Sequence, residues 1–156
     1  RLSDVGYAIK DNSDIVDIEE GDSETGYIYV LKSLSENPRI AATKSLFKIG
    51  FSTTSVEERI KNAQQDPTYL MAPVSIVATY KCFNMNPQRF ERLIHRFFSS
   101  SCLDLEVTDS NGMGYVPKEW FIAPIMVINK AIDLIIKGEI VNYSYDKDKE
   151  LIIKIK

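Results

Sequence analysis

The sequence predicts an α/β (α+β) fold, with a small, mainly antiparallel central sheet of three strands flanked by helices. Three stretches, 26–31, 46–51 and 74–83, have the apolar alternation and the β-branched and aromatic content of strands. Two later stretches, 87–99 and 124–137, carry apolar residues at helical spacing. With 156 residues, 44% of them hydrophobic, the chain is long enough for one domain with its own core.

The first two strands place polar aromatic and basic side chains on one surface. Side chains alternate between the faces of a strand, so Tyr27 and Tyr29 share one face while Ile28 takes the other. In the second strand, Lys48 lies opposite the apolar face that contains Ile49. If these strands pair, the phenols and the ammonium group can meet.

The first helix is predicted from a capping box. Ser55 precedes Glu58 by three residues, which favours a helix over 56–64. Its inner stripe includes Ala63, and Arg59 lies on its flank. The residues 33–45 before this helix form a loop longer than a hairpin needs.

The second helix carries the strongest amphipathic pattern in the chain. Asn86 and Pro87 supply an N-cap and a first helical residue, and the pattern continues to about Ser99. Glu91 and His95 lie four residues apart, so both can act on one site. Beyond an irregular connection over 99–117, a last helix closes at Gly138 and an edge strand is predicted at 151–156.

Charge divides the chain into an acidic N-terminal arm, residues 1–24, and a mildly basic domain, residues 25–156. The arm has a net charge of −6 and the remainder a net charge of +3. Such an arm is typical of a solvated, loosely ordered segment. The alternative is a segment that folds over the basic surface or binds a partner.

Composition excludes several classes of protein. Cys82 and Cys102 are too few and too far apart for a cysteine zinc site, which favours a reduced, intracellular protein, cytoplasmic or nuclear. No apolar run approaches the roughly 18 residues of a membrane helix, and no signal peptide is recognisable. We therefore expect no membrane contact.

Five features occur in one order that resembles the GIY-YIG endonuclease superfamily. They are Gly26-Tyr-Ile-Tyr29, Lys48-Ile-Gly50, Arg59, Glu91 with His95, and Lys118-Glu-Trp-Phe121. The resemblance is to the branch of phage and fungal meiotically upregulated proteins with a K-I-G second motif, and it covers about residues 25–121. It implies a metal-dependent endonuclease that hydrolyses DNA phosphodiester bonds, with Mg²⁺ or Mn²⁺ as cofactor.

The resemblance also implies roles for individual residues. Glu91 matches a metal-binding glutamate, and a single carboxylate suits a hydrated Mg²⁺ ion. Arg59 matches an arginine that donates to phosphate oxygens. Tyr29 or Lys48 is then the group that activates water, which for a phenol requires nearby positive charge.

Further residues are assigned supporting roles. His95 is a candidate for proton transfer, or else a flank residue paired with Glu91. Tyr27 is a candidate for substrate contact, and Glu119 is structural or supports the lysine. The basic residues expected to contact DNA phosphates are Lys32, Arg39, Lys44 and Arg92.

The alternative function is a catalytically silent module that binds nucleic acid or protein on the same fold. It is favoured by Lys48 in place of the family tyrosine, and by Ala63 where the superfamily often has histidine or tyrosine. In both interpretations a small domain makes few sequence-specific contacts. A further targeting domain or a protein partner is therefore expected to supply specificity.

Overall fold

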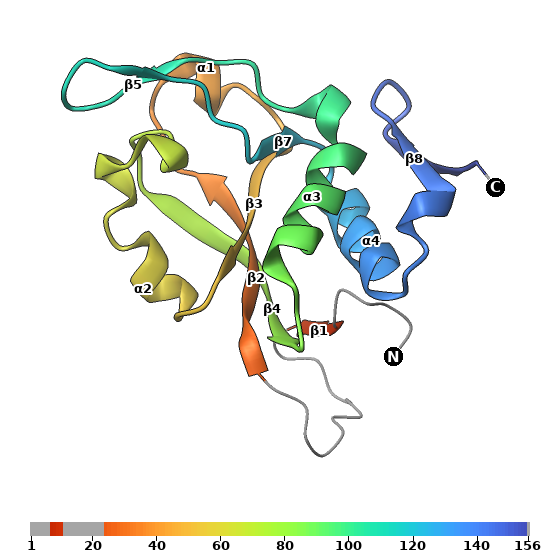
Figure 1. The fold of residues 1–156 in the computed structure, drawn as a ribbon. Helices are drawn as coiled ribbons and strands as arrows, with labels where there is room; N and C mark the ends of the chain where they lie inside the picture. The colour runs from red at the N-terminus through yellow and green to blue at the C-terminus, as the bar shows by residue number, and fades with distance from the viewer. Residues whose placement is uncertain (1–6, 11–23, 156) are drawn as a thin grey trace.

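The protein contains a five-stranded antiparallel sheet with the strand order β1–β4–β2–β3–β7 (Figure 1). The computed structural model describes residues 7–10 and 24–155. The strands are β1 (Tyr7–Lys10), β2 (Glu24–Ser33), β3 (Leu46–Ser52), β4 (Val74–Phe83) and β7 (Trp120–Ile122). The predicted fold class is confirmed, but the sheet has five strands instead of three. The two additional strands are only four and three residues long, too short for a clear alternating pattern.

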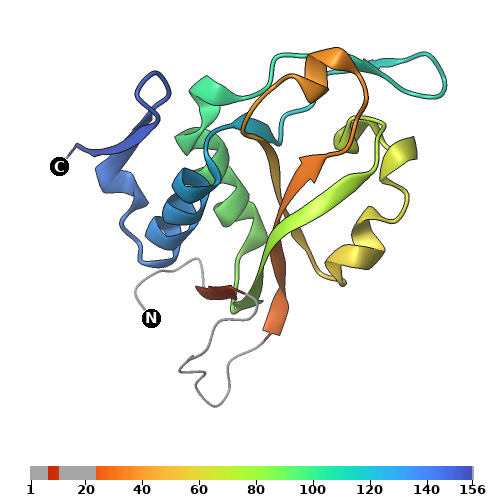
Figure 2. The same cartoon turned by 180° about the vertical axis from the view of Figure 1, so that it is seen from behind.

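Helices cover both faces of the sheet. In Figures 1 and 2, α3 (Pro87–Phe97) and α4 (Ile125–Ile136) pack on one side, and α2 (Val56–Ile60) lies on the other. Short helical turns and two small hairpins make up the rest of the regular structure in the described residues. They are α1 (Pro38–Ala41), η1 (Ala63–Gln65), η2 (Pro67–Tyr69), η3 (Ser99–Ser101), η4 (Ile140–Asn142), β5 (Val107–Thr108), β6 (Gly114–Tyr115), β8 (Tyr143–Asp146) and β9 (Leu151–Lys154).

The alternation predicted for β2 separates two cores. Ile28 and Val30 join the large core against α3 and α4, where Phe90 and Ile132 are fully buried. Complete burial of one such side chain contributes about 1.5–3 kcal/mol. Tyr29, from the other face of β2, packs against α2, η1 and η2. The sheet therefore isolates an apolar side from a side that carries polar groups.

Two helix starts are confirmed in atomic detail. The Ser55 hydroxyl accepts a hydrogen bond from the Glu58 amide at 3.2 Å, and Asn86 Oδ1 accepts one from the Arg89 amide at 3.1 Å. Glu58 does not complete the expected capping box, because its carboxylate pairs with Lys61 at 2.6 Å. α2 also ends at Ile60 instead of continuing to residue 64, and the chain resumes as the 3₁₀ helix η1.

The loops contain structure that the sequence pattern did not reveal. The 33–45 connection includes α1, which Asn37 caps by accepting from the Arg39 amide at 3.0 Å. The 99–117 connection includes the hairpin of β5 and β6. The predicted edge strand is present as β9, but it pairs with β8 in a separate hairpin.

The acidic arm lies mostly outside the described residues. Residues 1–6 and 11–23 are not described, whereas Tyr7–Lys10 form β1 and pair with β4. Glu24 already belongs to β2. In the described part of the chain, no helix has the length and apolar character needed to cross a membrane.

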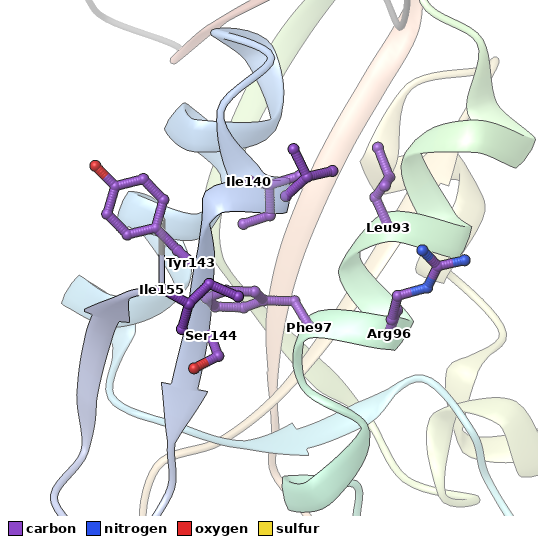
Figure 3. Close-up of a pocket in the computed structure, with 8 residues that line it drawn as sticks. Leu93, Arg96, Phe97, Ile140, Tyr143, Ser144 and Ile155 are labelled. Carbon is purple, nitrogen blue, oxygen red and sulfur yellow. The ribbon is translucent and has the colours of Figure 1, made fainter.

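A pocket of about 300 Å³ lies between α3 and the C-terminal hairpin (Figure 3). Leu93, Arg96 and Phe97 line it from α3, and Ile140, Tyr143 and Ile155 line it from the C-terminal segment. None of the residues assigned a catalytic role borders this pocket. The candidate site is therefore elsewhere in the fold.

Candidate functional site

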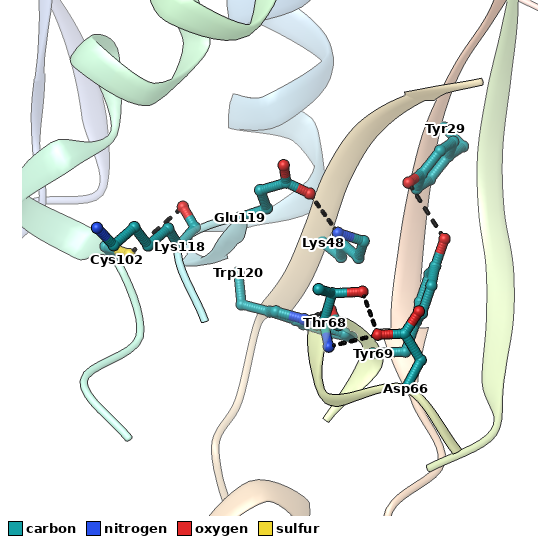
Figure 4. A network of polar contacts seen from close by, with 9 residues as sticks. All are labelled: Tyr29, Lys48, Asp66, Thr68, Tyr69, Cys102, Lys118, Glu119 and Trp120. Carbon is teal, nitrogen blue, oxygen red and sulfur yellow. Dashed lines mark hydrogen bonds and ion pairs between the residues drawn. The ribbon is translucent and has the colours of Figure 1, made fainter. Parts of the chain in front are cut away.

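Tyr29 lies in a buried cluster of phenols next to a guanidinium group. Its side chain is 1% exposed, and its hydroxyl lies 3.5 Å from the hydroxyl of Tyr69 (Figure 4). Arg59, on the exposed flank of α2, interacts with both hydroxyls. Burial and the neighbouring Tyr69 raise the pKa of Tyr29 well above its ordinary value. The phenol therefore stays protonated at neutral pH, and its hydroxyl oxygen can accept a hydrogen bond from the Arg59 guanidinium.

Gly50 makes room for Tyr29 on the neighbouring strand. The two residues are paired in the register of β2 and β3. A Cβ atom at position 50 would lie 2.4 Å from the Tyr29 hydroxyl oxygen, closer than any real contact. The glycine of the Lys48-Ile-Gly50 motif is therefore required by the close approach of the phenol.

Lys48 is a buried cation with two defined neighbours. Its side chain is 2% exposed, and its ammonium group forms an ion pair with Glu119 (Figure 4). The same nitrogen lies 5.1 Å from the centre of the Tyr69 ring, a cation–π distance. The phenol ring that lies beside Lys48 is that of Tyr69, whereas the expectation concerned Tyr27 and Tyr29 of the first strand. Tyr29 itself pairs with Gly50, while Leu31 is the register partner of Lys48.

Glu91 and His95 extend from α3 toward these groups. Burial raises the pKa of Glu91, and the negative charge of Glu119 raises it further, while Lys48 and Arg59 oppose the shift. Burial lowers the pKa of His95, so the imidazole is neutral at pH 7. Its ring packs against the ring of Phe121 at 5.4 Å between centroids. Within the described residues, its Nε2 is a buried polar atom without a hydrogen-bond partner.

These interactions bring together all five residues predicted as catalytic. Tyr29 comes from β2, Lys48 from β3, Arg59 from α2, and Glu91 and His95 from α3. The positive charges of Lys48 and Arg59 both lower the pKa of Glu91, so the three groups share one electrostatic environment. Trp120 and Phe121, from the Lys118-Glu-Trp-Phe121 motif, are buried at 0% and 1% exposure.

The donor set suits a loosely held, hydrated cation. Among the described residues, no group of three histidine, cysteine or acidic side chains is arranged as a metal cage. Glu91 and Glu119 are two half-buried carboxylates, and the negative charge of Glu119 raises the pKa of Glu91. Mg²⁺ is commonly held by one or two carboxylates while it keeps several waters. The residues present therefore fit Mg²⁺ better than they fit a structural zinc ion.

Sequence reasoning missed Tyr69. Tyr69 lies in a loop with no catalytic pattern, and Asp66-Pro67, a capping pair, was the local signal that this loop is ordered. Glu119 was assigned a structural or supporting role, and its pairing with Lys48 agrees with that assignment. Both residues contact Lys48, so the lysine is the centre of the polar cluster.

The predicted phosphate-binding residues lie around the rim of the domain. Lys32, Arg39 and Lys44 are exposed near the end of β2 and around α1. Arg92 is exposed on α3 directly after Glu91, and consecutive helical residues do not face the same direction. Tyr27 is half-buried and packs beside the core that contains Tyr29.

Comparison with known proteins identifies the family. The T5orf172 domain matches residues 26–136, a span that includes every residue of the candidate site. The chain belongs to the T5orf172 domain family. The expected assignment to the GIY-YIG endonuclease superfamily, with its K-I-G branch, is corrected by this match, because the T5orf172 domain is the family that covers the same motifs.

A curated relative of this chain is considerably longer than the region it shares with it. The uncharacterized protein YeeC of Bacillus subtilis (strain 168) is 47% identical over 133 residues, which are 84% of this chain and 35% of YeeC. The chain thus spans about a third of the relative that it matches. No solved structure matches it. Membership of the T5orf172 family is compatible with a function related to nucleic acids.

Proposed function

We propose that this T5orf172 domain hydrolyses phosphodiester bonds of DNA with the help of Mg²⁺ or Mn²⁺. The observation that carries the proposal is the convergence of Arg59, Lys48 and Glu91, from three separate elements, around a buried pair of phenols. Two cations beside a half-buried carboxylate are the groups that phosphoryl chemistry requires. A domain that only binds nucleic acid has no physical need for this combination.

Each residue has a chemical task in this proposal. Arg59 is exposed and presents a planar set of donors that can hold two phosphate oxygens at once. Lys48 adds positive charge behind the phosphate, and the protonated hydroxyl of Tyr29 holds Arg59 in place. The neutral imidazole of His95 is suited to accept a proton.

The proposed metal ligand is Glu91, with Glu119 as its neighbour. A bound Mg²⁺ would supply an activated water and would neutralise charge on the phosphate. The carboxylate of Glu91 must be ionised to bind a cation, and Lys48 and Arg59 both favour that form. The protein contributes the fixed position of this carboxylate on a rigid helix.

Cleavage of DNA tests the proposal directly. Supercoiled, linear and single-stranded DNA are incubated with Mg²⁺ or Mn²⁺, and Arg59→Ala is compared with Arg96→Ala, which removes an arginine that borders the separate pocket. We expect cutting that requires metal, and a loss of about 100-fold in Arg59→Ala because transition-state charge is no longer stabilised. Absence of metal-dependent cutting by the unmodified protein on all substrates would contradict the proposal.

The second candidate is a silent module that binds nucleic acid without cutting it. It is favoured by the burial of Tyr29 and Lys48, whose side chains are only 1% and 2% exposed to solvent. For this candidate, DNA binding should persist unchanged in variants of Glu91 and should not depend on metal. The cleavage experiment distinguishes the two candidates.

We propose that Lys32, Arg39 and Lys44 contact DNA phosphates. Replacement of all three by glutamine should reduce the slope of log affinity against log salt by about 2 to 3, because fewer counterions are released. The matched control replaces the exposed Lys147, Lys149 and Lys154 of the C-terminal hairpin, far along the chain from the site. Equal slopes for the two triple variants would remove this surface from the DNA interface.

We propose that the protein acts inside the cell, in the cytoplasm or nucleus, because its proposed substrate is DNA. Selection of a DNA site is assigned to a further domain or a protein partner, since the matched relative extends well beyond the shared region. This assignment can be checked by comparing the DNA preference of this chain with that of a longer form.

A further inference from the structure

We propose that Tyr69 is a positioning residue that holds the Arg59 guanidinium and the Lys48 ammonium in one geometry for binding a phosphate. This inference rests on the proposed function and extends it to a residue outside the predicted motifs. Tyr69 is 3% exposed, so it acts through its neighbours and does not itself touch DNA.

Both the hydroxyl and the aromatic ring of Tyr69 interact with residues of the site. Its hydroxyl lies 3.5 Å from the Tyr29 hydroxyl and interacts with Arg59. Its ring lies 5.1 Å below the Lys48 ammonium. A tyrosine is well suited to this double task, because the π face attracts a cation while the hydroxyl remains free for hydrogen bonds. The residue thus links two cations that come from different elements.

Hydrogen bonds on Thr68, the residue before Tyr69, fix the backbone of the loop that carries the ring. Asp66 Oδ1 accepts hydrogen bonds from the Thr68 amide at 2.9 Å and from the Thr68 hydroxyl at 2.7 Å. The buried indole of Trp120 donates to the Thr68 carbonyl at 3.0 Å (Figure 4). Leu70 and Met71 then adopt left-handed backbone conformations, with φ of 62° and 55°.

Such backbone conformations persist in residues other than glycine when the surroundings over-determine them. The three hydrogen bonds of Thr68 and the buried side chain of Leu70 provide that constraint. The loop therefore fixes Tyr69 from both sides. A precise position is what a group needs if it is to orient a guanidinium for transition-state contacts.

The inference explains how Arg59 can work from a short helix. α2 has five residues, and Arg59 is on its exposed flank, where an arginine side chain is ordinarily mobile. The position one turn later is Ala63, a buried small residue that offers no polar support. Tyr69 supplies that support from the following loop. Loss of its hydroxyl should then disorder Arg59 without removing it.

The test compares three variants of the full chain. Tyr69→Phe keeps the ring beside Lys48 and removes the hydroxyl, while Tyr69→Leu removes both. The control, Tyr80→Phe, removes a buried hydroxyl that donates to Asn129 at 2.6 Å on the opposite side of the sheet. Thermal unfolding confirms that each variant folds. The two readouts are steady-state cleavage kinetics and ¹⁵N relaxation of the Arg59 Nε–H group, assigned with Arg59→Lys.

We expect Tyr69→Phe to lower kcat by about 10- to 100-fold with KM within about 2-fold, because positioning acts mainly in the transition state. The Arg59 Nε–H signal should become mobile in Tyr69→Phe and stay ordered in Tyr80→Phe. Tyr69→Leu should lower kcat further. A rigid Arg59 in Tyr69→Phe, or a kcat equal to that of Tyr80→Phe, would overturn the inference.

The relaxation readout separates this inference from the proposed function. If the unmodified protein cuts no DNA but Arg59 becomes mobile in Tyr69→Phe, the positioning role stands and the nuclease proposal fails. If the protein cuts DNA and Arg59 is equally ordered in all variants, the nuclease proposal stands and Tyr69 has no positioning role.

Discussion

Replacement of Glu91 by glutamine is expected to lower metal-supported DNA cleavage by about 100-fold or more. Glutamine has nearly the same shape but no charge, so the cation loses its proposed anchor while α3 keeps its packing. Glu91 is half-buried beside Lys48 and Arg59, and removal of its charge leaves those two cations without their carboxylate neighbour on α3. Addition of EDTA to the unmodified protein should have the same effect.

The control for this prediction is Glu57→Gln, which changes an exposed carboxylate in the first turn of α2. Mn²⁺ binding measured by electron paramagnetic resonance provides a readout independent of cleavage. Glu91→Gln should weaken Mn²⁺ binding, and Glu57→Gln should leave it unchanged. Undiminished Mn²⁺ binding and cleavage in Glu91→Gln would show that the cation is held elsewhere.

The second large effect is expected on the free energy of unfolding, when the Lys48–Glu119 ion pair is broken. Glu119→Gln leaves a 2%-exposed ammonium group without its counter-charge, and should lower the free energy of unfolding by about 2 kcal/mol. This value is below the usual cost of breaking a buried pair, because Glu119 is 36% exposed and water can partly replace it. Lys48→Met removes the buried charge itself and should stay within about 1 kcal/mol of the unmodified protein.

Urea unfolding measures both changes. The double variant Lys48→Met with Glu119→Gln should be more stable than Glu119→Gln alone, since no buried charge remains. Lys61→Met, in the exposed pair with Glu58, is the control and should change stability by less than about 0.5 kcal/mol. If Lys48→Met were more destabilising than Glu119→Gln, the ammonium would contribute more to the fold than its burial suggests. Both single variants should lose cleavage.

The parts of the fold that the sequence predicted well are governed by local physics. The caps at Ser55 and Asn86 depend on residues within three positions, and both are present. The stop of α4 before Gly138 likewise follows from that glycine, whose φ is 73°. The strands β1 and β7 were missed because their pairing partners are distant in sequence and their own patterns are short.

The candidate site also has a part that the sequence predicted and a part that it missed. Strand periodicity is a property of consecutive residues, so the sequence placed Tyr29 opposite Ile28 and Lys48 opposite Ile49 within their own strands. The pairing of β2 with β3 then puts Tyr29 and Lys48 on one side of the sheet. The sequence could also place Glu91 and His95 on one helix. Local patterns carry no information about which loop folds onto that surface.

The neighbours of Tyr29 and Lys48 were decided by tertiary packing. Tyr69 is 40 residues from Tyr29, and Glu119 is 71 residues from Lys48. Their positions depend on the Asp66 turn, on the Trp120 indole and on the pairing of β3 with β7. The sequence by itself therefore determined which face of the sheet carries polar groups. The folded structure determined that these groups are buried and paired, because contacts between distant segments are what exclude water from them.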